Sequence, residues 1–217
     1  MFFRRILVGR TGGQIMIVII DYGMGNLSSV QNGFAEAGFE TLVSSDPAEI
    51  AAADGLVLPG VGAFGQAMEN LRRDQLDQVV LQRAAKGVPL LGICLGLQLL
   101  FDRSKEMGDF SGLGLIPGEI VLFDGPLKVP QIGWNQLDVK RSHPLLDGIN
   151  NGDYFYFVHS YHARPDREDV ILATADYGID FPAVVQKDNV YGIQFHPEKS
   201  SRLGLRILAN YGRLVEC

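Results

Sequence analysis

The chain has 217 residues, of which 47% are hydrophobic and 20% are charged, so it predicts a folded protein with a sizeable core rather than a disordered one. Its formal net charge of −6 argues against nucleic acid or an anionic membrane surface as the main partner. Two cysteines offer no disulfide framework, which is typical of a reducing, cytoplasmic compartment, and no apolar run approaches the ~18 residues of a membrane span.

The first fifteen residues, "MFFRRILVGRTGGQI", carry three arginines and no acid. Their apolar stretch is too broken for a good secretory signal. A second methionine, Met16, opens a clean strand pattern, "MIVIID". We therefore predict a poorly ordered extension over residues 1–15 and a single domain over residues 16–217.

The first half of the chain alternates between short apolar runs and helical periodicity. We predict strands at residues 17–20, 41–43, 55–62 (running into a glycine-rich loop) and 89–93. Helices are predicted from residue 26 or 28 to about 37, from residue 46, from 64 to 85, and after residue 94. This βαβαβαβα order predicts a mostly parallel sheet with helices on both faces.

The second half consists of short alternating segments separated by turn residues. Six of them predict strands: "EIVLF", "VPQIGWNQL", "YFYFVHSYHA", "DVILATA", "PAVVQK" and "VYGIQF". We predict that they form antiparallel additions at one edge of the parallel sheet, followed by a last helix over residues 201–215. The fold class is therefore α/β, with no repeat or linker dividing the chain.

A cysteine stands between two glycines where a predicted strand turns into a helix, in "GICLG" at residues 92–96. Such a turn raises one side chain above the carboxyl edge of the sheet, as in G-x-S-x-G hydrolases. The helix N-terminus favours a thiolate at Cys94, and the backbone N–H of Leu95 points to where an oxyanion would form. Taken alone, the pattern fits a small buried hydrophobe equally well, so a nucleophile needs a base and an orienting acid.

The base and the acid are found together in "FHPEKS". His196 follows a predicted strand, and Glu198 is two residues further on, on the same side of an extended chain. The carboxylate can then hold the imidazole in one tautomer while its other nitrogen faces a thiol. A solvated strand end is the commoner explanation of His-Pro-Glu alone. Because Cys94 and His196 both follow carboxyl ends of predicted strands, where α/β sheets bind ligands, catalysis is favoured.

Cofactor sites are not indicated. His159 and His162 are three apart on a predicted strand, so they are expected to face opposite sides, which argues against a metal site. "DYGMGN" does not match G-x-G-x-x-G, which argues against a dinucleotide. We predict neither a metal nor an organic cofactor.

At this point the sequence resembles a known family. "GICLGLQLLF" with "FHPEKS" is similar to the triad glutamine amidotransferases, which hydrolyse glutamine through a Cys-His-Glu set on a flavodoxin-like sheet. The ordered series "DYGMGNLSSV", "LPGVGAF", "GLGLIPG", "VPQIGWN", "FVHSY" and "FHPEKSS" resembles the glutaminase subunits of imidazole glycerol phosphate synthase, from histidine biosynthesis. The resemblance extends from residue 16 onward, and the motifs "DYGMGN", "PGVG" and "GWN" carry the narrower resemblance to the synthase subunits.

The resemblance implies roles for individual residues. Cys94 is the nucleophile, His196 the acid and base, and Glu198 the residue that orients the imidazole. Backbone N–H groups form the oxyanion hole, at Gly60, Val61, Gly62 and Leu95. Further positions bind the L-glutamine substrate: Gln98, Glu106, His159, Ser160 and Tyr161.

The resemblance also implies a partner, a barrel-shaped cyclase that receives ammonia through an internal channel in an obligate heterodimer. It puts Asn26 and Trp134 near that partner, although a helix cap and a core residue explain them as well. Two positions depart from the family: Gln131, where histidine is usual, and Lys105, where a second acid is common.

Three alternatives remain open. The chain could be a sibling amidotransferase that supplies another synthase, a catalytically silent docking subunit, or a stand-alone cysteine hydrolase of another γ-glutamyl compound. "DYGMGN" and "GWN" argue against the first, and the intact Cys94, His196 and Glu198 argue against the second.

Overall fold

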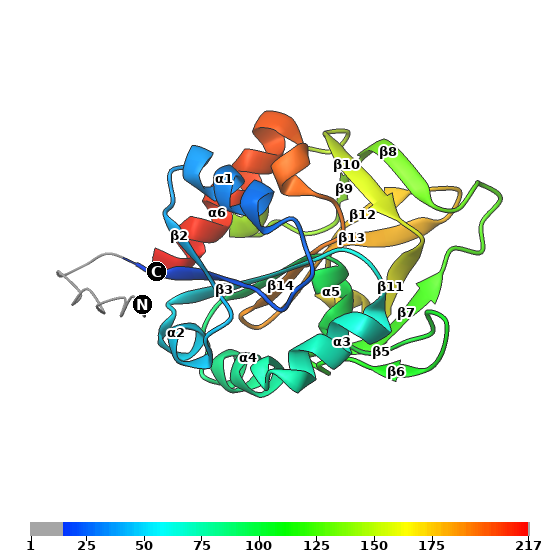
Figure 1. Ribbon diagram of the computed structural model, residues 1–217. Coiled ribbons are helices and arrows are strands. Elements are labelled where there is room, and N and C mark those ends of the chain that lie inside the picture. Colours follow the sequence, from blue (N-terminus) through cyan, green and yellow to red (C-terminus); the bar gives the residue numbers. More distant parts are fainter. Residues whose placement is uncertain (1–14, 217) are drawn as a thin grey trace.

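The computed structural model describes residues 15–216, which form a three-layer α/β fold around an eight-stranded sheet (Figure 1). The strand order is β2-β1-β3-β4-β14-β13-β12-β9, with β2 through β14 parallel and the last three antiparallel. The strands are β1 (Ile17–Ile20), β2 (Thr41–Ser44), β3 (Gly55–Gly60), β4 (Leu90–Cys94), β9 (Asp138–Val139), β12 (Ile171–Asp176), β13 (Asp180–Lys187) and β14 (Val190–Ile193). The predicted fold class is confirmed.

Helices cover both faces of this sheet. One face packs against α1 (Leu27–Glu36) and α6 (Ser201–Glu216), and the other packs against α2 (Pro47–Ala52), α3 (Phe64–Arg73), α4 (Leu76–Ala85) and α5 (Leu95–Leu99). Along β1, Ile17 and Ile19 belong to the first core, whereas Val18 and Ile20 belong to the second. Alternate residues of a strand face opposite sides, so burial of both faces explains the unbroken apolar run.

Two small sheets lie beyond the carboxyl ends of the parallel strands, on the side of the molecule away from the start of β1 (Figure 1). One pairs β8 (Gln131–Gln136) with β10 (Tyr154–His159). The other has the order β11-β7-β5-β6, from β11 (Tyr161–Pro165), β7 (Ile116–Leu122), β5 (Phe101–Ser104) and β6 (Phe110–Ser111). Three 3-10 helices complete the fold: η1 (Pro144–Leu146), η2 (Glu168–Val170) and η3 (Pro197–Lys199).

Two expectations about the elements were wrong. The predicted helix over residues 64–85 is divided into α3 and α4, because Gln75 adopts a left-handed φ of 58°. The predicted helix after Cys94 is present as α5 and ends after five residues, because residues 113 and 115 donate to the carbonyls of Leu99 and Leu100 that further turns would need. Of the predicted antiparallel edge additions, only β12 and β13 extend the main sheet in that way. β14 lies inside the sheet and runs parallel to β4, and β7, β8, β10 and β11 form two separate sheets.

The segment "YFYFVHSYHA" is also two strands rather than one. β10 pairs with β8, and β11 pairs with β7, so the chain changes sheet at Ser160. His159 and His162 therefore do not face opposite sides as predicted. Both rings stack against Phe123, with centroid distances of 5.1 and 4.7 Å.

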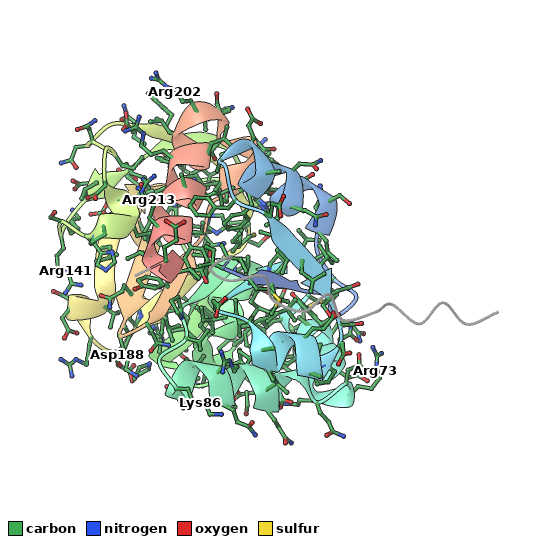
Figure 2. The ribbon with its side chains drawn as sticks, turned by 90° about the vertical axis from the view of Figure 1, so that its left-hand side faces the viewer. Arg73, Lys86, Arg141, Asp188, Arg202 and Arg213 are labelled. Atoms are coloured by element: carbon green, nitrogen blue, oxygen red, sulfur yellow. The ribbon has the colours of Figure 1, made fainter. Side chains whose placement is uncertain are left out.

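The predicted extension over residues 1–15 lies, apart from residue 15, outside the described residues, and the domain boundary at residue 16 stays a prediction. Within residues 15–216, no helix is long and apolar enough to cross a membrane. Figure 2, turned by 90° from the view of Figure 1, shows charged side chains such as Lys86 and Asp188 projecting outward.

Candidate active site

Cys94 stands at the tight bend between β4 and α5. It has φ 55° and ψ −111°, and it is 6% exposed. A Cβ atom on Gly96 would lie 1.7 Å from the carbonyl oxygen of Leu58, and one on Gly92 would lie 2.6 Å from that of Gly96. Both flanking glycines are thus required by close backbone approach, which lets the bend sit against β3 and brings the sulfur to the carboxyl edge of the sheet.

His196 and Glu198 form a buried pair at the end of β14, the strand beside β4. Nδ1 of His196 lies 2.9 Å from Oε1 of Glu198, and the two side chains are 4% and 2% exposed. The backbone N–H of His196 donates to the carbonyl of Tyr156, and the hydroxyl of Ser200 donates to the carbonyl of His196. These two bonds hold the backbone of His196, and the contact of Glu198 with Nδ1 orients its ring.

The surroundings of His196 favour its charged form. Burial alone lowers the pKa of the imidazole, because it penalises the cation. Interactions with Cys94 and Glu198 outweigh burial and raise this pKa to about 10. The other ring nitrogen, Nε2, is buried with no hydrogen-bond partner of standard geometry among the described residues. It is therefore available to a sulfur or a substrate.

A pocket of about 290 Å³ opens above Cys94. Most of the predicted site residues line it, and Val158 and Pro130 complete its wall. The predicted residues in the lining are Val61, Gly62, Cys94, Leu95, Gln98, Glu106, His159, Ser160, Tyr161 and His196. The structure therefore gathers residues from six separate parts of the chain around one cavity of small-molecule size.

The predicted oxyanion loop lies directly beside the cysteine. Gly60 ends β3 and is the register partner of Cys94 in β4. Gly62 has φ +101°, a left-handed conformation that side chains other than glycine rarely adopt. Leu95 is the first residue of α5, so its N–H is among those left without a helical partner. Backbone donors are thus available on two sides of the sulfur.

Gln194 is a site residue that the sequence analysis did not single out. Its Nε2 donates to Sγ of Cys94 at 3.8 Å, and its Oε1 accepts from Gln98 at 3.3 Å. Gln98 in turn donates to the carbonyl of Tyr161 at 3.0 Å. The signal was present, because Gln194 precedes His196 by two positions, and strand residues two apart share a face.

The remaining predicted substrate contacts come from the loop after β5 and from the junction of β10 and β11. Glu106 lines the pocket, and its Oε2 accepts from the backbone N–H of Phe64 at 2.6 Å. His159 donates from Nδ1 to the carbonyl of Tyr161 at 2.8 Å. Burial lowers the pKa of His159 to about 4, so its imidazole is neutral at pH 7.

The two predicted interface residues lie outside the pocket. Asn26 caps α1 by accepting from Ser29 N–H at 3.3 Å, and it is exposed. Trp134 is 52% exposed and stacks edge-on with Tyr156, so it is not a core residue.

The two departures from the family pattern have different surroundings. Gln131 is buried, is the register partner of His159, and has no hydrogen-bond partner for its Oε1 among the described residues. Lys105 is a surface residue that pairs with Asp109 at 2.8 Å. Among residues 15–216, no group of three His, Cys, Asp or Glu side chains could hold a metal ion.

The glutamine amidotransferase class-I family model matches residues 18–212, which span every residue of the pocket. The chain therefore belongs to the class-I glutamine amidotransferase family. Solved structures share the fold at low sequence identity. A glutamine amidotransferase is 21% identical with a TM-score of 0.72, covering 90% of this chain and 98% of its own. PurLQS from Thermotoga maritima is 16% identical with a TM-score of 0.74, covering 93% and 99%.

Relatives at higher identity narrow the assignment within that family. The chain is 55% identical over 199 residues to imidazole glycerol phosphate synthase subunit HisH of Symbiobacterium thermophilum, covering 92% of this chain and 94% of that protein. It is 53% identical over 204 residues to HisH of Syntrophotalea carbinolica, covering 91% and 99%. HisH of Aquifex aeolicus is 50% identical over 200 residues, covering 92% and 97%. Within the family, the chain groups with these HisH subunits.

Proposed function

We propose that this chain is the glutaminase subunit of an imidazole glycerol phosphate synthase. It hydrolyses L-glutamine to glutamate and ammonia and delivers the ammonia to a cyclase subunit in histidine biosynthesis. The observation that carries the proposal is the meeting of Cys94 with the His196–Glu198 pair in one pocket beside the loop after β3. The match to HisH subunits along nearly the whole chain supports the choice of synthase.

The chemistry follows from the proposed roles. The Cys94 thiolate attacks the side-chain amide carbon of glutamine, and backbone N–H groups of Gly60, Val61, Gly62 and Leu95 stabilise the oxyanion. His196 passes its proton to the leaving nitrogen, which departs as ammonia. A water molecule, deprotonated by His196, then hydrolyses the thioester and releases glutamate. Glu198 orients the imidazole throughout.

The pocket suits glutamine at both ends of the molecule. The carboxylate of Glu106 is the charged partner for the α-ammonium group, and Gln98 and the segment of His159, Ser160 and Tyr161 line the wall around the substrate. The hydrogen bonds of Gln98 to Tyr161 and Gln194 hold this wall in place. No step needs a metal or an organic cofactor.

An exposed apolar surface supports the proposed heterodimer. Ile132 and Trp134 alternate along β8 on its outer face and are 62% and 52% exposed, and Val129 beside them is 40% exposed. Contiguous apolar exposure of this kind is typical of protein interfaces. Asn26 lies in the loop that packs on the oxyanion strand, since a Cβ on Gly25 would lie 3.7 Å from Gly60. We propose that both regions face a barrel-shaped cyclase.

Delivery to a partner answers a chemical problem. Ammonia that escapes into water at neutral pH becomes ammonium, which is not a nucleophile, so an internal route to the cyclase preserves it. We also propose a cytoplasmic location, which the reducing compartment indicated by the cysteine content supports.

The test is glutamate release by the chain alone, with the cyclase, and with the cyclase and its ribotide ligand. We expect slow hydrolysis alone and strong stimulation by the liganded partner. Full turnover by the chain alone, or on another γ-glutamyl compound, would indicate a stand-alone hydrolase. Co-purification with a different synthase would indicate a sibling amidotransferase.

A further inference from the structure

Two side chains hold the oxyanion loop at its two ends. The hydroxyl of Tyr22 donates to the carbonyl oxygen of Pro59 at 2.7 Å. The backbone N–H of Phe64 donates to Oε2 of Glu106 at 2.6 Å. Residues 60–63 lie between these two hydrogen bonds, and both anchoring side chains come from distant parts of the chain.

The contact of Tyr22 fixes the start of the loop. Tyr22 is 1% exposed, and burial together with the nearby charge of Cys94 raises the pKa of its phenol, so the hydroxyl keeps its proton and donates. A Cβ on Gly60 would lie 2.4 Å from this hydroxyl, so the site accepts only glycine there. Because a peptide unit is planar, holding the Pro59 carbonyl also fixes the direction of the Gly60 N–H.

The contact of Glu106 fixes the end of the loop. Helix α3 begins after Ala63, which provides no side-chain cap for the free N–H groups of the first turn. Glu106 supplies that acceptor from the loop between β5 and β6, and its negative charge suits the N-terminal end of the helix. The peptide unit joining Ala63 to Phe64 is thereby held.

We propose that Tyr22 and Glu106 are positioning residues of the glutaminase reaction, which together confine backbone rotation in the oxyanion loop to the three peptide units between Gly60 and Ala63. The inference rests on the proposed function. Those three units include the backbone N–H groups of Val61 and Gly62, the loop residues that line the pocket. Gly62 already has a left-handed φ of +101°, and as a glycine it allows the neighbouring peptide units to rotate. Because Glu106 also lines the pocket, one carboxylate connects substrate binding to loop geometry.

Tyr22→Phe tests the first contact, and Tyr211→Phe is its matched control. Tyr211 is fully buried, and its hydroxyl donates to carbonyls of Leu56, also on β3, and Pro89. Both variants lose a buried hydroxyl that donates to a carbonyl of β3, so a merely structural role predicts similar losses of stability and unchanged turnover for each. The readouts are kcat and KM for glutamine in the cyclase complex and amide hydrogen exchange over residues 59–66.

We expect Tyr22→Phe to lower kcat at least about tenfold, with KM within about twofold, because small misplacements of catalytic groups are costly. Exchange at residues 60–63 should also accelerate. Tyr211→Phe should keep kcat within about twofold of the unaltered complex. Equal kcat values for the two variants would overturn the inference for Tyr22.

Glu106→Gln and Glu106→Ala test the second contact. Glutamine keeps an oxygen that can accept from Phe64 N–H, whereas alanine does not, and both lose the charge proposed to bind the substrate ammonium. We expect both to raise KM but only alanine to lower kcat and to accelerate exchange at Phe64. Identical exchange in the two variants would overturn the inference for Glu106. Absence of glutamate release by the unaltered complex would instead refute the proposed function, and this inference with it.

Discussion

Gly60 and Cys94 are register partners in the parallel pair of β3 and β4, at the last residue of each strand. Neighbouring parallel strands end at the same edge of a sheet. The segments that follow Gly60 and Cys94 therefore lie side by side, although they are more than thirty positions apart in sequence. His196 reaches the same edge from β14, on the other side of β4. Three adjacent strands thus bring together the proposed nucleophile, its base and its oxyanion donors.

Glu198→Gln is expected to lower kcat for glutamine hydrolysis by about 10²–10⁴, because an amide can impose the wrong tautomer on the imidazole. The substituted side chain has the same shape as Glu198 and can still reach Nδ1 of His196, which lies 2.9 Å from Oε1 of Glu198, but it carries no charge. Steady-state glutamate release in the cyclase complex measures this. Glu168→Gln, at an exposed position in η2, is the control and should be neutral. Turnover of Glu198→Gln equal to that control would remove Glu198 from the mechanism.

Gln194→Leu is expected to slow alkylation of Cys94 by iodoacetamide at pH 7 by about tenfold, because a donor to an anionic sulfur is worth roughly 1.5–3 kcal/mol. The variant removes the 3.8 Å contact to Sγ and leaves Gln98 without one acceptor. Gln186→Leu, at the far end of the neighbouring strand β13, should alkylate at the unaltered rate. Mass spectrometry of the labelled peptide gives the rate, and equal rates for the two variants would contradict the assignment of Gln194 to the site.

The buried His159 predicts acid sensitivity. Its pKa of about 4 in the folded chain lies below the ordinary 6.5, so only the unfolded chain gains a proton between these values. The folded state is therefore fully favoured above pH 6.5 and loses up to about 3 kcal/mol as the pH falls towards 4. The difference in unfolding free energy between the unaltered chain and His159→Phe should shift by that amount over the window. If the unfolding free energies of the two proteins changed with pH in the same way, His159 would not titrate as described.

The apolar surface on β8 predicts the site of partner binding. Ile132→Asp and Trp134→Ala should each raise the dissociation constant of the cyclase complex at least about tenfold, because exposed anchors of this kind dominate interface energies. Iodoacetamide labelling of Cys94 should stay at its unaltered rate. Lys86→Asp, at the C-terminal end of α4 and away from β8 (Figure 1), is the control. Unchanged affinity of both apolar variants for the cyclase, measured by calorimetry, would show that the interface does not include this surface.

Much of the fold could be predicted because its signals are local. The unbroken apolar runs at residues 17–20 and 55–60 predict parallel strands, and residue 46 followed by proline predicts the start of α2. The order of β and α segments then predicts the layered sheet. Helix α5 was predicted, but its short length was not, because it is set by hydrogen bonds from residues 113 and 115, which no local pattern reveals.

The site residues likewise divide into those with a local sequence signal and those placed by long-range contacts. Cys94, His196 and Glu198 stand in short motifs with clear spacing, so their meeting was predictable. The roles of Tyr22 and Glu106 at the loop depend on contacts across 37 and 42 positions of sequence, with a backbone carbonyl and a backbone N–H. Backbone atoms carry no sequence signature, so only the folded chain reveals such contacts.

Cys94→Ala in the complex with the cyclase tests the central claim most directly. The removed sulfur should abolish glutamine-dependent formation of imidazole glycerol phosphate, while synthesis from added ammonia continues at the unaltered rate because the cyclase is intact. Formation of product from glutamine by the variant would contradict the account and identify the chain as a catalytically silent docking subunit.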